Sequence, residues 1–210
     1  MRRILLAGAT GLVGREILQS LLADDTVDSI HVLARRPGAI AHPKLVWHVV
    51  DFASLPALPA MDEVYLALGT TIKTAGSQAA FRAVDFDMNL AVARAALQAG
   101  ARRLGLVSAM GADSGARVFY NRVKGELESA LTALGFEGLV IARPSLLLGE
   151  RGALGQAPRA GERIGVMLAG LLRPLIPADY RPIKAVDVAR ALLAQVPKAR
   201  GTRILRSGAM

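Results

Sequence analysis

Residues 5–16 read LLAGATGLVGRE, and they place Gly8, Gly11 and Gly14 between a short aliphatic run and a segment of helical period. In a strand–turn–helix unit, the first glycine permits a tight turn, the second lets the backbone approach a pyrophosphate, and the third lets the helix contact the strand. The helix N-terminus adds free N–H groups and a favourable dipole for an anion. The stretch therefore predicts a dinucleotide-binding loop, and a turn that merely needs glycine is the alternative.

The rest of the chain alternates short aliphatic runs with longer segments of helical period. This alternation is typical of a parallel sheet that helices cover on both faces. We expect strands over residues 3–8, 29–34, 45–50, 63–68, 103–108 and 138–143. We expect helices over 11–24, 79–99 and 185–196, and an edge strand could follow at 203–206. The predicted fold class is α/β, with a doubly wound parallel sheet.

The length and composition fit one domain. A chain of 210 residues, of which 52% are hydrophobic, can bury one sizeable core, so we expect a single domain over residues 1–210. Because there is no cysteine, disulfides, thiolate metal sites and a cysteine nucleophile are excluded. His31, His42 and His48 lack the spacing of helical metal ligands and have no clear carboxylate partner. We therefore expect no metal.

The formal net charge of +9 raises the question of a nucleic-acid partner. The basic residues are scattered in pairs such as Arg2–Arg3 and Arg102–Arg103, and there are few aromatic residues to stack on bases. A solvated basic surface is the better interpretation, so we expect no nucleic acid.

The start of the chain has one feature of an export signal, since two arginines precede an apolar run. That run is short and leads into Arg15, Glu16 and a helical pattern, where a cleavage region should lie. No stretch of about 18 to 20 apolar residues is present to span a bilayer. We expect a cytoplasmic protein without a membrane span.

The end of the second predicted strand indicates which dinucleotide binds. An acidic residue at this place bonds the ribose 2′-hydroxyl of NAD, whereas an arginine accommodates the 2′-phosphate of NADP. The sequence HVLARRPG offers Arg35 and Arg36 and no carboxylate, so NADP is favoured over NAD. Asp51, just after the third strand, could approach the adenine or simply form a turn.

A second group of residues could carry chemistry. The sequence YNRVKGE places Tyr120 and Lys124 at positions i and i+4, on one face of a helix. An adjacent ammonium favours the phenolate form of a tyrosine, which brings it within range as a general acid or base. Ser108 ends a predicted strand, where its hydroxyl could hold a substrate carbonyl.

Five segments together resemble the short-chain dehydrogenase/reductase superfamily: GATGLVG, LVSAMGAD, YNRVKGELE, ARPSLLLGE and AVDVARALL. The middle of the chain, from LALGTT to LQAG, is most similar to the atypical, Tat-interacting-protein-like NAD(P)-binding branch. The resemblance implies a Rossmann fold, a nicotinamide cofactor and a triad of Ser108, Tyr120 and Lys124. It also implies a cofactor site that includes Thr10, Leu12, Val13, Gly69, Thr70, Tyr120, Lys124 and Pro144.

The chain departs from the superfamily at one position. Extended members usually carry an asparagine in the helix before the serine strand, whereas this chain has Asp85, followed by Asp87. The usual proton relay is therefore not assured here.

The leading hypothesis is an NADP-dependent oxidoreductase that moves a hydride between the nicotinamide and a carbonyl or alcohol substrate. Epimerase or dehydratase chemistry on a nucleotide sugar uses the same transient oxidation. The alternative from another class is a non-catalytic dinucleotide-binding regulatory protein.

Residues 149–184 should cover the substrate. They carry more basic than acidic side chains: Arg151, Arg159, Arg163, Arg173, Arg181 and Lys184 against Glu150, Glu162 and Asp179. This excess favours a small anionic substrate, with a solvated basic lid as the alternative. The oligomeric state is left open.

Overall fold

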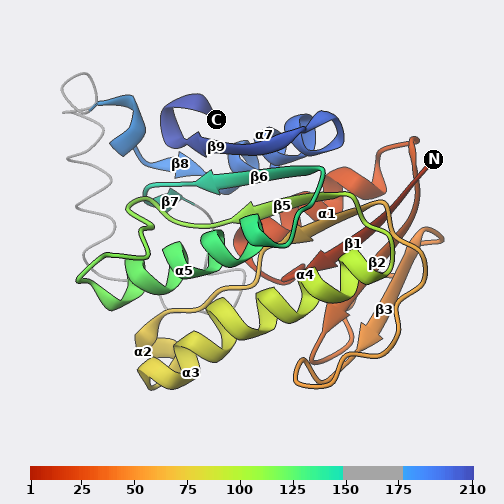
Figure 1. Cartoon of the computed structure of the whole chain (residues 1–210). Helices are drawn as coiled ribbons and strands as arrows, with labels where there is room; N and C mark the ends of the chain where they lie inside the picture. Colours follow the sequence, from red (N-terminus) through yellow and green to blue (C-terminus); the bar gives the residue numbers. More distant parts are fainter. Residues whose placement is uncertain (149–176) are drawn as a thin grey trace.

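A computed structural model describes residues 1–148 and 177–210, which form a seven-stranded parallel sheet between two layers of helices (Figure 1). The strands lie in the order β3-β2-β1-β4-β5-β6-β9, and every neighbouring pair is parallel. Their bounds are β1 Arg2–Ala7, β2 Val27–Ala34, β3 Leu45–Val49, β4 Glu63–Leu66, β5 Arg103–Val107, β6 Gly138–Arg143 and β9 Gly201–Arg206. The predicted doubly wound α/β fold is confirmed.

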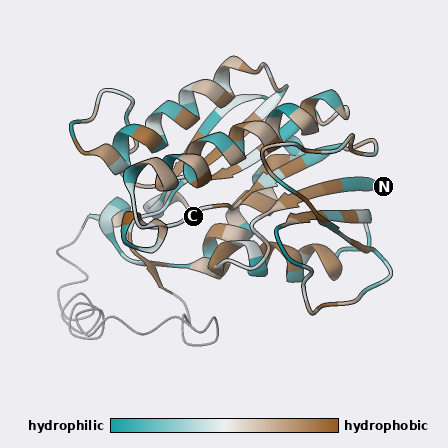
Figure 2. Ribbon diagram, turned by 90° about the horizontal axis from the view of Figure 1, so that it is seen from below, coloured by the Kyte–Doolittle hydropathy of each residue, from teal (hydrophilic) through white to brown (hydrophobic). Residues whose placement is uncertain are grey.

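The helices cover both faces because the strands are apolar on both sides. In β1, Ile4 and Leu6 belong to the core beneath α1 (Leu12–Leu22) and α7 (Ala185–Gln195). The alternate residues Leu5 and Ala7 belong to the core beneath α4 (Asn89–Gln98) and α5 (Phe119–Ala133). Figure 2 shows the strands as a largely apolar layer between helices whose outer faces are more polar.

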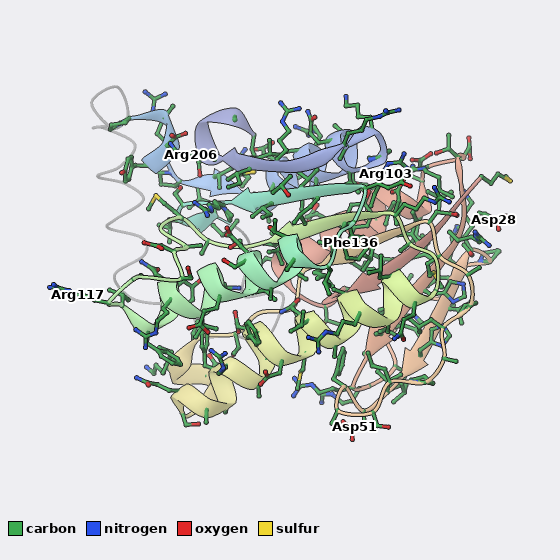
Figure 3. The ribbon with its side chains drawn as sticks, in the orientation of Figure 1. Asp28, Asp51, Arg103, Arg117, Phe136 and Arg206 are labelled. Carbon is green, nitrogen blue, oxygen red and sulfur yellow. The ribbon has the colours of Figure 1, made fainter. Side chains whose placement is uncertain are left out.

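The strand order reverses beside β1, which pairs with β2 on one side and with β4 on the other. Ligands of open α/β sheets bind outside the carboxyl ends of the strands at such a point. In Figure 3, Arg206 at the carboxyl end of β9 and Arg103 at the amino end of β5 lie toward opposite edges of the sheet. The fold therefore predicts that the site lies at the carboxyl ends of the strands, near the point where β1 separates β2 from β4.

The two arginines at the start of the chain make ion pairs at the amino-terminal edge of the sheet. Arg2 donates to Glu63 at 3.0 Å and to Asp24 at 2.6 Å. Tyr65 also donates to the buried carboxylate of Glu63, and burial raises the pKa of this phenol well above its usual value. These contacts tie β1 to β4 at the edge opposite the site.

The prediction of one regular helix over residues 79–99 is wrong. The chain forms α3 (Gln78–Arg82), a π-helical segment (Ala83–Met88) and then α4. The side-chain amide of Asn89 donates to the carbonyl oxygens of Val84, Asp85 and Leu68. The hydrogen bond to Leu68 ties the π-helical segment to the loop after β4. Short π-helical segments occur frequently at functional sites.

The C-terminal part contains several elements that the sequence pattern did not reveal. Two short strands, β7 (Leu147–Leu148) and β8 (Ile183–Lys184), pair with each other, and β9 begins earlier than predicted. The chain also forms α2 (Ile72–Ala75) and 3₁₀ turns over Ala178–Tyr180, Val196–Lys198 and Ser207–Ala209. Most of the proposed lid falls on residues 149–176, outside the described residues. Within the described ranges, no helix has the length and apolar character needed to cross a membrane.

Two of the histidines contact each other across β2 and β3. The Nδ1 atom of His31 lies 2.8 Å from Nε2 of His48, and the rings stack with centroids 5.1 Å apart. Burial, and then the nearby charge of His48, lowers the pKa of His31. The folded protein therefore favours the neutral form of His31.

This shift predicts that acid weakens the fold. A folded-state pKa below the unfolded value of about 6.5 contributes stability above that pH and loses it as the pH falls. We expect His31→Phe to flatten the decline in the free energy of unfolding below about pH 6.5, measured by urea denaturation at a series of pH values. His42→Gln, which lies outside the pair, should keep the slope of the parent. Equal slopes for parent and His31→Phe would contradict the assignment.

Candidate functional site

The glycine loop connects β1 to α1 at the carboxyl edge of the sheet, and two of its glycines are required by close contacts. Gly8 has φ +92°, and a Cβ there would lie 2.4 Å from the backbone of Ala67. A Cβ on Gly14 would lie 2.0 Å from the carbonyl oxygen of Gly8. Gly11 has more room, since its Cβ would lie 3.4 Å from the same oxygen. Its own N–H donates to Gly8 at 3.0 Å.

The first turn of α1 offers free N–H groups to a ligand. Gly11 is the N-cap and provides no side-chain acceptor, and the first turn has no acidic residue. The first N–H groups of a helix have no acceptor within the helix, and the dipole there favours an anion. Thr10 is exposed and Leu12 half-buried, whereas Val13 packs in the core. These features fit the diphosphate of a dinucleotide.

Arg35 and Arg36 follow β2 directly, and both side chains are exposed. Neither makes a hydrogen bond or an ion pair with the described residues. Asp51 follows the neighbouring strand β3, is exposed, and accepts a hydrogen bond from the N–H of Ala53 at 2.9 Å. The turn-forming interpretation of Asp51 is therefore present in the structure, while the two guanidinium groups remain available to a ligand.

The face of α5 that carries Tyr120 and Lys124 lies against the π-helical segment and the end of β4. The ring of Tyr120 packs 5.4 Å from the ring of Phe81, centroid to centroid. The ammonium of Lys124 lies 2.7 Å from Oδ1 of Asp85, and both residues are buried. A Cβ on Gly69 would lie 3.8 Å from the same ammonium. The structure thus brings Lys124 beside the predicted cofactor residues Gly69 and Thr70.

A glycine sets the position of α5 on the sheet. A Cβ on Gly125 would lie 2.2 Å from the backbone of Asp113 and Ser114. The helix therefore approaches the loop after β5 more closely than a larger residue would allow. This contact fixes the depth at which Tyr120 and Lys124 enter the site.

Ser108 lies directly after β5 and is buried, and its hydroxyl donates a hydrogen bond to Glu128. Glu128 also accepts three hydrogen bonds from Arg143, two from Nε at 3.1 Å and one from Nη2 at 2.6 Å. Sequence reasoning missed both partners. Glu128 lies four residues after Lys124, on the same face of α5 as Tyr120 and Lys124, so the helical spacing could have predicted that it lies near the site.

The turn after β6 completes this edge. Pro144 is buried, and its carbonyl oxygen accepts a hydrogen bond from the N–H of Met110 at 2.9 Å. The ends of β5 and β6 are thereby held together beyond the last strand residues. Among the described residues, no group of three or more histidine or acidic side chains could hold a metal ion.

A hollow of about 590 Å³ lies between the first turns of α1 and α7 and the ends of β7 and β8. It is lined by Leu12, Arg15, Glu16, Leu148, Lys184, Ala185 and Val186. Its lining includes Leu12, which follows the glycine loop, and none of Ser108, Tyr120 and Lys124.

The strand order, the glycine loop and the uncapped first helix together define a Rossmann-type dinucleotide-binding protein. Residues 8–138 match the NAD(P)H-binding family, and the chain belongs to that family.

Curated relatives match over most of their length. The chain is 37% identical over 182 residues to the mitochondrial protein fmp52 of Emericella nidulans, which covers 82% of this chain and 76% of the relative. It is 36% identical over 202 residues to FMP52 of Coccidioides immitis, covering 89% of this chain and 82% of the relative.

Solved structures share the fold at low sequence identity. A short-chain dehydrogenase/reductase superfamily protein from Agrobacterium tumefaciens with bound NAD has a TM-score of 0.72 and 17% identity, covering 97% of this chain and 77% of that one. MoeE5 in complex with UDP-glucose and NAD has a TM-score of 0.71 and 19% identity, covering 97% and 75%. These structures confirm the Rossmann fold that the motifs predict.

The cytoplasmic location predicted from the sequence is contradicted by the curated relatives. Those from Emericella nidulans, Eremothecium gossypii, Coccidioides immitis and Candida albicans are all named as mitochondrial proteins. The expectation relied on the short apolar run at the start of the chain, and that run carries no information about an organelle.

The contacts of the glycine loop predict different outcomes for two alanine variants. Gly14→Ala should destabilise the fold by about 1–3 kcal/mol, because its Cβ would overlap the carbonyl oxygen of Gly8. Gly11→Ala should keep nearly the parent stability but weaken dinucleotide binding, because its methyl group would occupy the approach to the diphosphate. Urea denaturation and calorimetric titration measure the two effects. A stable Gly14→Ala variant, or a Gly11→Ala variant with parent affinity, would contradict the respective role.

Proposed function

We propose that this protein is an NADP-dependent oxidoreductase that transfers a hydride between the nicotinamide and a carbonyl or alcohol carbon. The observation that carries the proposal is the placement of Lys124. Its buried ammonium lies beside Gly69 and Thr70 at the end of β4, one helical turn from Tyr120. The glycine loop supports the same assignment, since its free N–H groups suit the diphosphate.

In the proposed reaction, the cofactor supplies or accepts the hydride, and Tyr120 exchanges the proton with the substrate oxygen. The hydroxyl of Tyr120 makes no hydrogen bond with the described residues, so it is available to a substrate. Lys124, whose ammonium pairs with Asp85 at 2.7 Å, holds the nicotinamide ribose through its hydrogen-bond donors.

Ser108 takes a narrower role than the motif alone implies. Its proton is directed to Glu128, so a substrate carbonyl could receive it only if the hydroxyl turned away from that carboxylate. The oxygen of Ser108 still has lone pairs that can accept a hydrogen bond. We therefore propose that Ser108 accepts a hydrogen bond from an alcohol substrate.

The same hydrogen bond favours the second candidate function, a non-catalytic dinucleotide-binding regulatory protein. In such a protein Ser108, Glu128 and Arg143 would only join α5 to β5 and β6. The two candidates differ in turnover and share cofactor binding.

For the substrate, we propose a small anionic molecule. Of the basic residues that suggested this class, Lys184 is described, and it lines the hollow beside the glycine loop as an exposed side chain. The others, apart from Arg181, fall on residues 149–176, outside the described residues. An anionic substrate would pair with such cations through charge-assisted hydrogen bonds.

The cofactor preference predicts tighter binding of NADPH than of NADH by the parent. Charged hydrogen bonds to the 2′-phosphate are worth roughly 1.5 to 3 kcal/mol, which corresponds to a preference of about 10- to 150-fold. Replacing Arg35 and Arg36 with alanine should weaken NADPH binding by a similar factor and leave NADH binding nearly unchanged. Calorimetric titration at fixed salt measures both affinities, since salt screens phosphate contacts. Equal affinities of the parent for both cofactors would refute the preference.

Turnover separates the enzyme from the regulator. Tyr120→Phe should keep the fold and the NADPH affinity but lower the rate with any carbonyl substrate by on the order of 10² to 10⁴. The measurement is the loss of NADPH absorbance against a panel of carbonyl compounds, anionic and neutral. If the variant kept the parent rate, Tyr120 would not be the proton donor. If the parent bound NADPH but turned over no compound, the regulatory function would be favoured.

A further inference from the structure

Asp85 occupies an unusual position for a carboxylate. It is 0% exposed and lies within the π-helical segment, whereas Asp87, two residues later, is exposed. Its Oδ2 atom accepts a hydrogen bond from the N–H of Thr70 at 2.8 Å, and its Oδ1 lies 2.7 Å from the ammonium of Lys124. One side chain therefore contacts both the turn after β4 and Lys124 of α5.

The buried charges of Asp85 and Lys124 compensate each other. Lys124 is 4% exposed, and a buried ammonium without a counter-charge is strongly unfavourable. Asp85 supplies that charge through an ion pair that lacks hydrogen-bond geometry, since its Oδ1 has no hydrogen-bond partner among the described residues. The three donors of the ammonium make no hydrogen bond with the described residues and remain for a ligand.

Gly69 borders the pair directly. A Cβ on Gly69 would lie 3.5 Å from Oδ1 of Asp85 and 3.8 Å from the ammonium. The Oδ1 atom of Asn89, in the next turn, is also buried and has no hydrogen-bond partner among the described residues. Unpaired buried polar atoms of this kind are rare and call for an explanation.

We propose that Asp85 is a positioning residue that fixes the ammonium of Lys124 against the Gly69–Thr70 turn, so that the two form one prearranged clamp for the nicotinamide ribose. This inference rests on the proposed function. The carboxylate lies 2.7 Å from the ammonium of Lys124 and balances its charge, which a neutral side chain at this position could not do. The π-helical turn directs Asp85 inward, and Asn89 holds that turn through the carbonyl oxygens of Val84 and Asp85.

The test compares the affinity for NADPH with the affinity for adenosine 2′,5′-bisphosphate, a ligand that has only the adenosine part of the cofactor. Asp85→Asn should weaken NADPH binding about 10-fold or more, by the worth of a charged hydrogen bond, because Lys124 loses its partner. The same variant should bind adenosine 2′,5′-bisphosphate with the parent affinity, because that molecule lacks the nicotinamide half. Asp62→Asn is the matched control, since Asp62 pairs with Arg3 at the far end of β1, and it should change neither affinity. Calorimetric titration gives all the constants.

A second pair of variants keeps the test informative if Asp85→Asn folds poorly. Lys124→Met and the double variant Asp85→Asn/Lys124→Met contain no unpaired buried ammonium. If Asp85 acts through Lys124, adding Asp85→Asn to Lys124→Met should not weaken NADPH binding further. A full additional loss in the double variant, an equal loss for both ligands, or an unchanged NADPH affinity in Asp85→Asn would overturn the inference while leaving the proposed function intact. A parent protein that binds no NADPH would overturn both.

Discussion

The close contact between α1 and β1 determines how the rest of the site is arranged. Gly14 lies against the backbone of Gly8, and Gly8 lies against the backbone of Ala67 in the neighbouring chain segment. Three backbone segments therefore meet without intervening side chains. This contact brings the N-terminus of α1 to the point where the strand order reverses, and it brings the turn after β4 to the same point. The positions of Gly69, Thr70 and Lys124 follow from that meeting.

Much of the fold could be predicted from the sequence, because a parallel sheet that is covered on both faces needs continuous aliphatic strands. Strands β1 to β6 were found within a few residues of their ends. The π-helical segment was missed, since one extra residue in a turn leaves the apolar period of the surrounding helix almost unchanged. The two-residue strands β7 and β8 were missed because pairs so short have no period to detect.

The candidate site was predictable where its residues form local motifs, as in the glycine loop and the Tyr120–Lys124 pair. Its ion pairs were not predictable, because they join segments that are distant in the sequence. Asp85 meets Lys124 across 39 positions, and Glu128 meets Arg143 across 15. The sequence raised the question of Asp85 in place of asparagine, and only the fold shows that its carboxylate contacts the lysine. The prediction of a cytoplasmic location was wrong because the short apolar run on which it relied carries no information about an organelle.

The central place of β1 has a consequence for synthesis on the ribosome. The partner on one edge of β1 is β4, so the backbone groups of Ile4 to Ala7 on that edge stay unpaired until residues Glu63 to Leu66 have emerged. An apolar strand with a free edge is a template for pairing with other chains. The nascent protein therefore passes through a stage in which the apolar strand β1 has a free edge and is prone to aggregation.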